Sequence, residues 1–226
     1  MWQKGFGGSL NESPNSIIEL SDKNIICVGA SSSGVSGNKS IATYGKLDWW
    51  VIKLDKAGNE IWQKNYGGIE PESEFVYLKT GENGEFYLYG SSVSGPTGNK
   101  TTLSQGSMDY WLLKLNGDGD ILWQHSFGGN SIDYLRSLLV ENDSSFILSG
   151  QSQSVISGDK NESSYGGSDY WVLKIKLEQT TATYNEKESE VNIFPNPTND
   201  FLYINSDIEF DHSIISNLYG GRFYQK

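Results

Sequence analysis

The stretch Asp48-Trp49-Trp50-Val51-Ile52-Lys53-Leu54 decides the fold, because close copies of it begin at Asp109 and Asp169. The copies share the pattern Asp-[Tyr/Trp]-Trp-[Val/Leu]-[Ile/Leu]-Lys-[Leu/Ile], and the three aspartates lie 61 and 60 residues apart. Short runs of aromatic and β-branched residues between turn-forming residues are typical of β-strands. Each copy therefore predicts one strand, and its recurrence predicts a repeated structural unit.

A second block, Trp-Gln-[Lys/His]-x-[Phe/Tyr]-Gly-Gly, keeps the same long period. It begins at Trp2, Trp62 and Trp123. Two separate markers that share a period of about 60 residues identify a repeat protein.

Each period contains short apolar runs separated by Gly, Asn, Asp and Ser, and four antiparallel strands per repeat are the content of a propeller blade. We therefore predict an all-β fold, a β-propeller-like array of three four-stranded antiparallel blades followed by a small partial β-sandwich tail. The repeats span 9–68, 69–129 and 130–177. The predicted strands are 16–20, 24–29, 48–54, 60–66, 74–78, 85–90, 109–115, 120–127, 134–140, 145–150 and 169–175.

Paired aromatic residues in the third strand of each repeat are expected to hold the blades together. The pairs are Trp49/Trp50, Tyr110/Trp111 and Tyr170/Trp171. Adjacent residues of a strand point to opposite faces, so one ring of each pair can contact the next blade and the other ring the previous blade. The alternative is that some of these rings form a platform on which a sugar stacks.

The two ends of the repeat array are incomplete in complementary ways. Residues 1–8 carry only a fourth-strand block, and the last repeat supplies three strands. We predict that Trp2–Gly8 adds as an outer strand to the blade that contains Asp169–Ile175. Three blades are fewer than the roughly 4–8 of known propellers, which indicates a fragment of a longer propeller, an assembly of several chains or an open arc. We favour a fragment of a longer parent protein.

The bulk composition excludes some classes of partner. The chain has 226 residues and a formal net charge of −11, and an acidic surface repels nucleic acid and anionic membranes. Cys27 is the only cysteine, so we expect a small buried hydrophobic residue and no internal disulfide. No run approaches the roughly 20 apolar residues of a membrane-spanning helix, and no signal peptide is visible before the first repeat block.

Repeated lysine and aspartate positions are the candidate site residues. The loops Ser-Gly-Asn-Lys, Thr-Gly-Asn-Lys and Ser-Gly-Asp-Lys place lysines at Lys39, Lys100 and Lys160. These lysines either line one rim of the propeller and bind a polar ligand, or order their loops by pairing with the aspartates. The aspartates in question are Asp48, Asp109 and Asp169. The lysines inside the third strands alternate with apolar neighbours and are expected on a solvated face; they are Lys53, Lys114 and Lys174.

No constellation of residues predicts catalysis. His125 and His212 have no nearby cysteine or glutamate cluster, so we expect neither a metal site nor a cofactor. No Gly-x-Ser-x-Gly elbow occurs in a strand-to-helix context. The run Asn116–Asp120 resembles a calcium loop but lacks its final bidentate glutamate, which favours a hairpin turn.

After the repeats the sequence changes character. Residues 178–190 are polar and charged and are predicted to be a linker. The motif Phe194-Pro195-Asn196-Pro197 then precedes the strand-like run 201–204, and a second run ends in Gly220-Gly-Arg222. The proline-rich core predicts a turn before a strand.

These C-terminal motifs resemble the C-terminal sorting domain of the type IX secretion system, a small β-sandwich found in many secreted and surface proteins of Bacteroidota-type bacteria. The repeats resemble the propeller-like repeats that often precede it. The resemblance implies the type IX secretion machinery as a partner and a secreted or outer-surface location for the full-length parent. Residues 191–226 lack the final glycine-tyrosine strand and the basic end of that domain, which implies a partial sorting domain.

The sequence as a whole favours a non-enzymatic secreted or cell-surface β-propeller that binds or displays, with a glycan or a protein as ligand. The alternative is a propeller enzyme that acts on glycans, or a quinoprotein-like oxidoreductase. The characteristic Ala-x-Asp-x-x-Thr-Gly stretch of quinoprotein blades is absent from the sequence. A third option is a purely structural matrix or adhesion protein.

Overall fold

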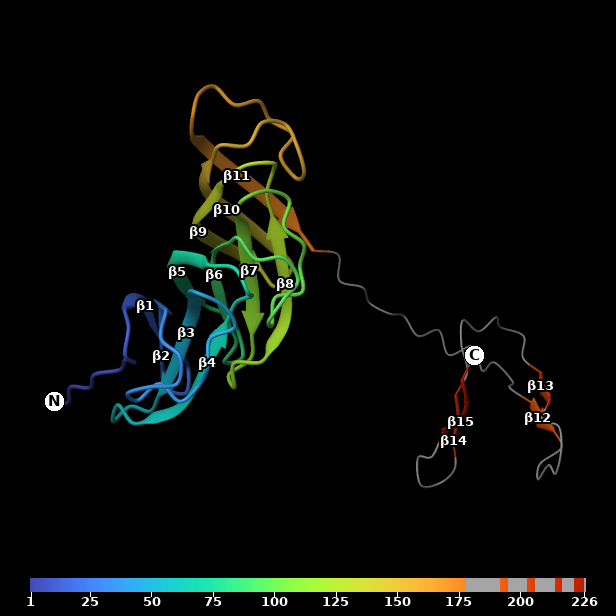
Figure 1. Cartoon of the computed structure of the whole chain (residues 1–226), viewed down its shortest axis with the longest axis horizontal. Coiled ribbons are helices and arrows are strands. Elements are labelled where there is room, and N and C mark those ends of the chain that lie inside the picture. The colour runs from blue at the N-terminus through green and yellow to red at the C-terminus, as the bar shows by residue number, and fades with distance from the viewer. Residues whose placement is uncertain (178–191, 195–202, 206–213, 217–221, 226) are drawn as a thin grey trace. The chain divides into compact units, whose positions relative to one another are not determined.

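The computed structural model describes residues 1–177 and four short strands at 192–194, 203–205, 214–216 and 222–225 (Figure 1). The chain divides into two compact units, Met1–Glu178 and Gln179–Lys226. All regular structure in the described residues is β-strand.

The first unit consists of three antiparallel sheets in sequence order. Of the predicted three four-stranded antiparallel blades, the structure confirms three antiparallel sheets with four, four and three strands, and these sheets do not close into a propeller. The first sheet comprises β1 (Glu12–Glu19), β2 (Ile25–Ser31), β3 (Asp48–Leu54) and β4 (Glu60–Tyr66). The second comprises β5 (Glu72–Thr80), β6 (Phe86–Ser92), β7 (Asp109–Leu115) and β8 (Ile121–Phe127). The third comprises β9 (Asp133–Asn142), β10 (Ser145–Ser152) and β11 (Asp169–Lys176).

Glycine-containing hairpin turns connect the last two strands of the four-stranded sheets. Gly58 and Gly119 adopt φ values of 78° and 76°, a region that suits glycine. In the second turn, the side chain of Asn116 accepts hydrogen bonds from the backbone N–H groups of Asp118 (3.0 Å) and Asp120 (2.8 Å). The run Asn116–Asp120 is therefore a hairpin turn, as the sequence predicts.

Aromatic rings join each sheet to the next. Trp49 of β3 stacks on Trp111 of β7 with ring centroids 4.8 Å apart. Tyr110 of β7 contacts Trp171 of β11 with ring centroids 4.9 Å apart, in a tilted arrangement. The prediction that the two rings of a pair contact opposite neighbours is thus confirmed for Tyr110 and Trp111, whereas the first and third pairs each make one such contact. Mainly apolar side chains from both sheets surround each contact.

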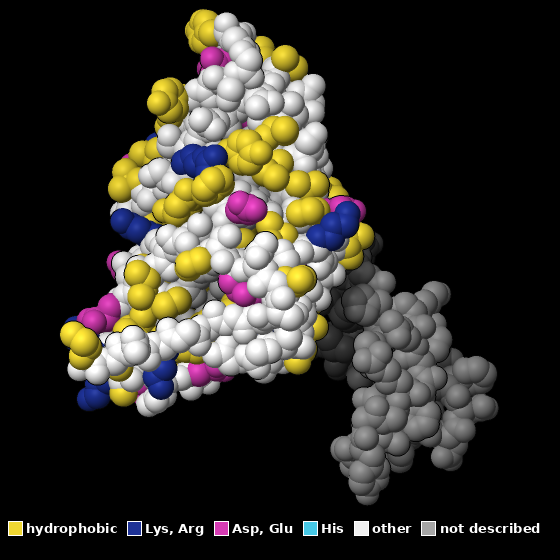
Figure 2. Space-filling view, turned by 60° about the vertical axis from the view of Figure 1, so that its left-hand side comes forward, with side chains coloured by type: hydrophobic (Ala, Val, Ile, Leu, Met, Phe, Trp, Pro, Cys, Tyr) yellow, Lys and Arg dark blue, Asp and Glu magenta, His cyan; other side chains and the backbone are white. Residues whose placement is uncertain are grey.

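The sheets form an open series. The first sheet contacts the second chiefly through β5, and the second contacts the third chiefly through β9. Between the described strands of the first and third sheets there is no contact. Strands β1, β5 and β9 lie along one side of the unit (Figure 1), and Figure 2 brings this side forward to show bands of hydrophobic side chains with few charged groups between them.

The N-terminal segment lies against the first sheet and forms no strand. Gly7 donates its N–H to Asn38 Oδ1 (2.8 Å), and Trp2 Nε1 donates to the carbonyl of Lys56 (3.2 Å). The prediction that Trp2–Gly8 adds to the blade of Asp169–Ile175 is therefore wrong within a single chain. The second sheet separates the two ends, so the segment cannot reach β11 of its own chain.

Lysines inside the third strands also depart from the prediction of a solvated face. Lys53 and Lys114 are buried because the neighbouring loops and the next sheet cover them. Lys53 Nζ donates to the carbonyl of Gly117 in the second sheet (2.8 Å), and Lys114 Nζ pairs with Glu85 (2.7 Å). Only Lys174, which no following sheet covers, is exposed in accordance with the prediction.

In the second unit, the described residues form two antiparallel pairs. β12 (Asn192–Phe194) pairs with β13 (Tyr203–Asn205), and β14 (Ile214–Ser216) pairs with β15 (Arg222–Gln225). Phe194 and Arg222 of the predicted sorting motif lie in these strands. The predicted linker 178–190, the residues Pro195–Pro197 and Gly220 lie outside the described residues.

Candidate functional site

The three repeated lysines are buried inside their own loops. Lys39 Nζ donates to the carbonyls of Ser33 (2.9 Å) and Ile41 (3.0 Å). Lys100 Nζ makes the same bonds to Ser94 (2.8 Å) and Thr102 (3.1 Å), and Lys160 Nζ donates to Ser154 (2.7 Å). Each ammonium group thus closes the loop between the second and third strands of its sheet. Burial lowers the pKa of Lys100 to about 8.

The repeated aspartates begin their strands and hold the preceding turn. Asp48 Oδ2 accepts the N–H of Tyr44 (2.5 Å), and Asp109 Oδ2 accepts the N–H of Gln105 (2.6 Å). Asp169 makes the equivalent bond to Tyr165 (2.7 Å). Lysine and aspartate therefore both order the loop, but each does so through the backbone and not through the direct ion pair that the sequence suggested.

Sequence reasoning missed a second repeated carboxylate, at the start of the first strand of each sheet. Glu12, Glu72 and Asp133 occupy this position and keep the repeat period, which was the available signal. Glu72 is buried and accepts hydrogen bonds from the Gly68 N–H (3.2 Å) and the Ser92 hydroxyl (3.1 Å).

Glu72 and Asp48 form a carboxyl pair at the junction of the first two sheets. Glu72 Oε2 and Asp48 Oδ1 are buried without a hydrogen-bond partner in the described residues. A Cβ added at Gly67 would lie 2.5 Å from the first oxygen and 2.6 Å from the second. The two oxygens thus lie within about 5 Å of each other, where burial and like charge both disfavour ionisation. Burial first, and the charge of Asp48 after it, raise the pKa of Glu72. One proton held between the two carboxyls would satisfy both oxygens.

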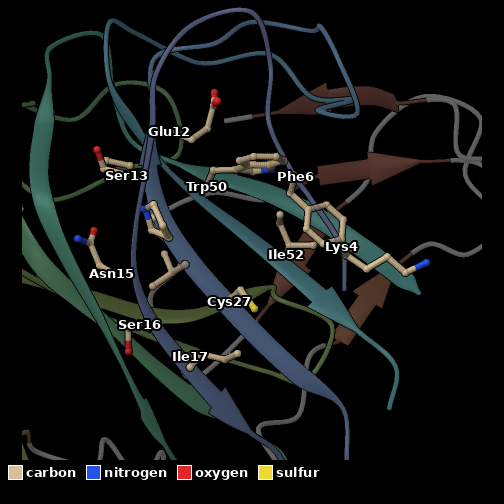
Figure 3. Close-up of a pocket in the computed structure, with 14 residues that line it drawn as sticks. Lys4, Phe6, Glu12, Ser13, Asn15, Ser16, Ile17, Cys27, Trp50 and Ile52 are labelled. Atoms are coloured by element: carbon tan, nitrogen blue, oxygen red, sulfur yellow. The ribbon is translucent and has the colours of Figure 1, made fainter. Parts of the chain in front are cut away.

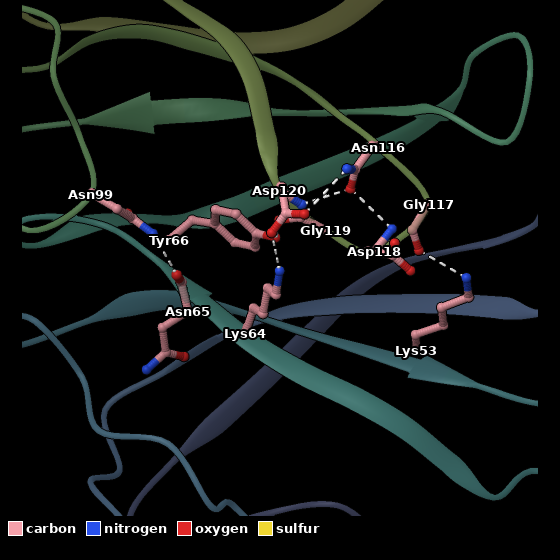
Figure 4. A network of polar contacts seen from close by, with 10 residues as sticks. All are labelled: Lys53, Lys64, Asn65, Tyr66, Asn99, Asn116, Gly117, Asp118, Gly119 and Asp120. Atoms are coloured by element: carbon pink, nitrogen blue, oxygen red, sulfur yellow. Dashed lines mark hydrogen bonds and ion pairs between the residues drawn. The ribbon is translucent and has the colours of Figure 1, made fainter. Parts of the chain in front are cut away.

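A groove of about 430 Å³, lined by both polar and apolar side chains, lies at the same junction. Figure 4 shows how its residues meet: Lys64 Nζ of β4 pairs with Asp120 Oδ1 of the β7–β8 turn (2.6 Å), and the Tyr66 hydroxyl donates to the Gly119 carbonyl (2.5 Å). Asn65 lines the base of the groove, and its Oδ1 is buried without a donor in the described part of the chain. We call this site the β4 groove.

The polar residues that line the β4 groove differ at the second junction. In the second repeat, His125 and Ser126 replace Lys64 and Asn65, and the Ser126 hydroxyl is already bonded to that of Thr102 (2.6 Å). His125 lies in β8 beside the ring of Trp123 (5.4 Å), and burial lowers its pKa. Among the described residues no three His, Cys, Asp or Glu side chains are grouped to hold a metal ion.

A second hollow, of about 590 Å³, is mainly apolar and lies on the outer face of the first sheet. Figure 3 shows Ile17, Cys27, Trp50 and Ile52 of the sheet around it, with Phe6 of the N-terminal segment at one side. We call this site the first-sheet hollow. Cys27 is half-buried there, and burial raises the pKa of its thiol, which makes the thiol less reactive.

Comparison of the chain with models of known protein families and with curated proteins gave no match. Within the part of the chain that the structure describes, no helix is long and apolar enough to cross a membrane.

Proposed function

We propose that this protein is a non-enzymatic secreted or cell-surface protein that uses its stacked sheets for binding or display. The β4 groove is the proposed binding site, and a hydroxyl-rich ligand such as a glycan is the proposed ligand. The C-terminal segment from residue 191 is proposed to direct export through the type IX secretion machinery.

The proposal that the stacked sheets act as a scaffold is supported by the hydrogen bonds of the repeated polar side chains. The ammonium groups of Lys39, Lys100 and Lys160 are engaged by carbonyls and hydroxyls of their own loops. The repeated glutamines act likewise: Gln63 Oε1 accepts from Trp50 Nε1 (3.2 Å), and Gln124 Oε1 accepts from Trp111 Nε1 (3.1 Å). The repeated lysine and glutamine side chains therefore hold strands and loops together.

The observation that carries the binding proposal is the buried Asn65 Oδ1 in the β4 groove. Buried polar atoms normally have a hydrogen-bond partner, so this acceptor marks a point of the groove that can take a further donor, from water or from a ligand hydroxyl. Lys64 and Asp120 at the groove add a charged donor and acceptor, and the half-exposed Tyr44 adds a ring on which a sugar can stack. Ligand hydroxyl groups both donate and accept, which matches this set.

A glycan array with the purified chain tests the binding proposal. The variant Asn65→Ser gives the first repeat the residue of the second, and Lys64→Met removes the charged donor. We expect the wild type to retain a set of glycans and both variants to lose them. Lys79→Met, at an exposed position of β5 outside the groove, is the matched control. Failure of the wild type to retain any glycan, or retention by both groove variants, would contradict the proposal.

Export is supported by the two strand pairs at the residues that carry the sorting resemblance. Surface labelling of intact cells of a bacterium that has a type IX system tests it. We expect the whole protein at the outer surface, and retention inside the outer membrane after removal of residues 191–226. Equal labelling of both forms would exclude a sorting role for the segment.

A further inference from the structure

Each junction between sheets is built from a ring and a socket. The ring is the first aromatic residue of the third strand, and the socket contains a glycine of the second strand in the next sheet. A Cβ added at Gly90 would lie 2.6 Å from the Trp49 ring, and one added at Gly150 would lie 2.6 Å from the Tyr110 hydroxyl. The floor of each socket is the second ring of the next sheet's third strand, Trp111 or Trp171.

The third sheet presents this ring without a socket. Tyr170 is 91% exposed, whereas its equivalents Trp49 and Tyr110 are fully buried. Two residues further along β11, Val172 is 62% exposed, whereas the equivalent Leu112 is fully buried. The face of β11 is thus the docking face of the other sheets, left open.

The first sheet has the socket without a ring. Its glycine is Gly29 and its floor is Trp50, and both line the first-sheet hollow. Figure 3 shows Trp50 there; it is 5% exposed, and Phe6 packs against its cluster. Ile17 at this face is 65% exposed, whereas Leu78 and Leu138, which occupy the equivalent positions opposite β6 and β10, are 6% and 5% exposed.

The N-terminal segment marks where the fourth strand of a preceding sheet would lie. Gly7 N–H bonds Asn38 Oδ1 (2.8 Å), as Gly67 N–H bonds Asn99 Oδ1 (3.0 Å) in the next repeat. Trp2 lies against Gly58, as Trp62 lies against Gly119. The segment therefore occupies its place on the first sheet but lacks a third strand with which to pair.

We propose that the chain assembles head to tail, with the third sheet of one copy docked on the first sheet of a second copy. Tyr170 of the first copy enters the first-sheet hollow of the second and stacks on Trp50. Residues 2–6 of the second copy add to β11 of the first as its fourth strand. The interface is heterologous, and strand addition supplies its backbone hydrogen bonds.

The register of this strand addition follows from the junctions already formed. Tyr110 pairs with Phe127 and Leu112 with His125, which places Phe6 opposite Tyr170 and Lys4 opposite Val172. Gln3 would then lie where Gln63 and Gln124 lie, and it would accept the indole N–H of Trp171. The same arrangement covers the exposed edge and face of β11, which otherwise invite unspecific pairing.

Light scattering on the whole chain after size exclusion tests the proposal. A single chain has a mass of 25.1 kDa, and we expect at least twice this mass at micromolar concentration. Tyr170→Asp should reduce the mass to one chain, and Ile17→Asp should do the same from the opposite face. Both side chains are exposed, so the variants leave the single chain folded. Leu122→Asp is the matched control, because Leu122 is 48% exposed but lies in β8 of the second sheet, which takes no part in the proposed interface.

Mixing the two monomeric variants tests the head-to-tail geometry. Each variant retains one intact face, so the mixture should form a complex of two chains that neither variant forms alone. A double variant Lys4→Cys/Val172→Cys in a Cys27→Ser background should form a disulfide between chains. A wild-type mass of one chain, an assembly that survives Tyr170→Asp, or a mixture without complex would each overturn the proposal.

Discussion

Replacing Glu72 with glutamine should remove much of the pH dependence of folding stability between pH 5 and pH 8. In the folded protein, burial and the neighbouring Asp48 raise the pKa of Glu72 from 4.5 to about 8. The folded state therefore keeps a proton that the unfolded state releases as the pH rises above 4.5. Stability is fully present below that value and falls as the pH rises towards the folded pKa.

The size of the effect follows from the rise in pKa. Each unit is worth 1.36 kcal/mol, so the loss for Glu72 amounts to at most about 5 kcal/mol at pH 8. Glutamine has the shape of the protonated acid: its oxygen can accept from Gly68 and Ser92, and its amide can donate to Asp48. Lys100 also faces Glu72, and the Glu72 charge raises the pKa of Lys100, so the variant lowers the pKa of Lys100 as well.

Urea unfolding followed by tryptophan fluorescence at pH 5 and pH 8 measures this difference. We expect similar midpoints for wild type and Glu72→Gln at pH 5, and a clearly higher midpoint for the variant at pH 8. Glu74→Gln changes an exposed glutamate of the same strand and should behave as wild type. Parallel pH dependences for wild type and Glu72→Gln would refute the shared proton.

Three further changes test the junctions and loops, each by the midpoint of chemical unfolding. Gly90→Ala should destabilise by about 1–3 kcal/mol, because its Cβ would clash with the Trp49 ring, whereas Gly95→Ala meets no atom within 4 Å and should cost less than half as much. Trp111→Ala removes the floor of a socket and should cost about 3–5 kcal/mol, and a cost under about 1 kcal/mol would show that the ring contact is dispensable. Lys100→Met leaves the carbonyls of Ser94 and Thr102 without their donor and should cost about 1–3 kcal/mol per lost bond, against little change for the exposed Lys79→Met.

The long period of the sequence predicted the strands well, because turn residues bound every apolar run. Strands β3, β4 and β7 have the predicted bounds, and the paired rings connect neighbouring sheets as alternation along a strand requires. The burial of Lys53 could not be predicted in this way, because its partner is a turn carbonyl 64 residues away. The β4 groove could not be predicted from the recurring residues, because Lys64 and Asn65 depart from the repeat pattern.

The N-terminal block is a second feature that the sequence predicts only in part. Its sequence identifies residues 2–8 as the partner of a third strand. It does not show whether this strand belongs to the same chain or to another chain. Only the separation of the first and third sheets by the second excludes β11 of the same chain.

That separation also governs how the first unit comes apart. Each described sheet touches only its immediate neighbours, so the free energy of the stack is a sum of sheet terms and nearest-neighbour terms. Melting can then proceed by fraying from one end. Both end sheets are bound on one face only, and the third, which has three strands instead of four, is the expected starting point. A chain with residues 69–129 duplicated would gain one sheet and one more junction, and its stability would rise by a fixed increment. The number of sheets is in this sense an adjustable quantity that a single in-frame duplication or deletion can change.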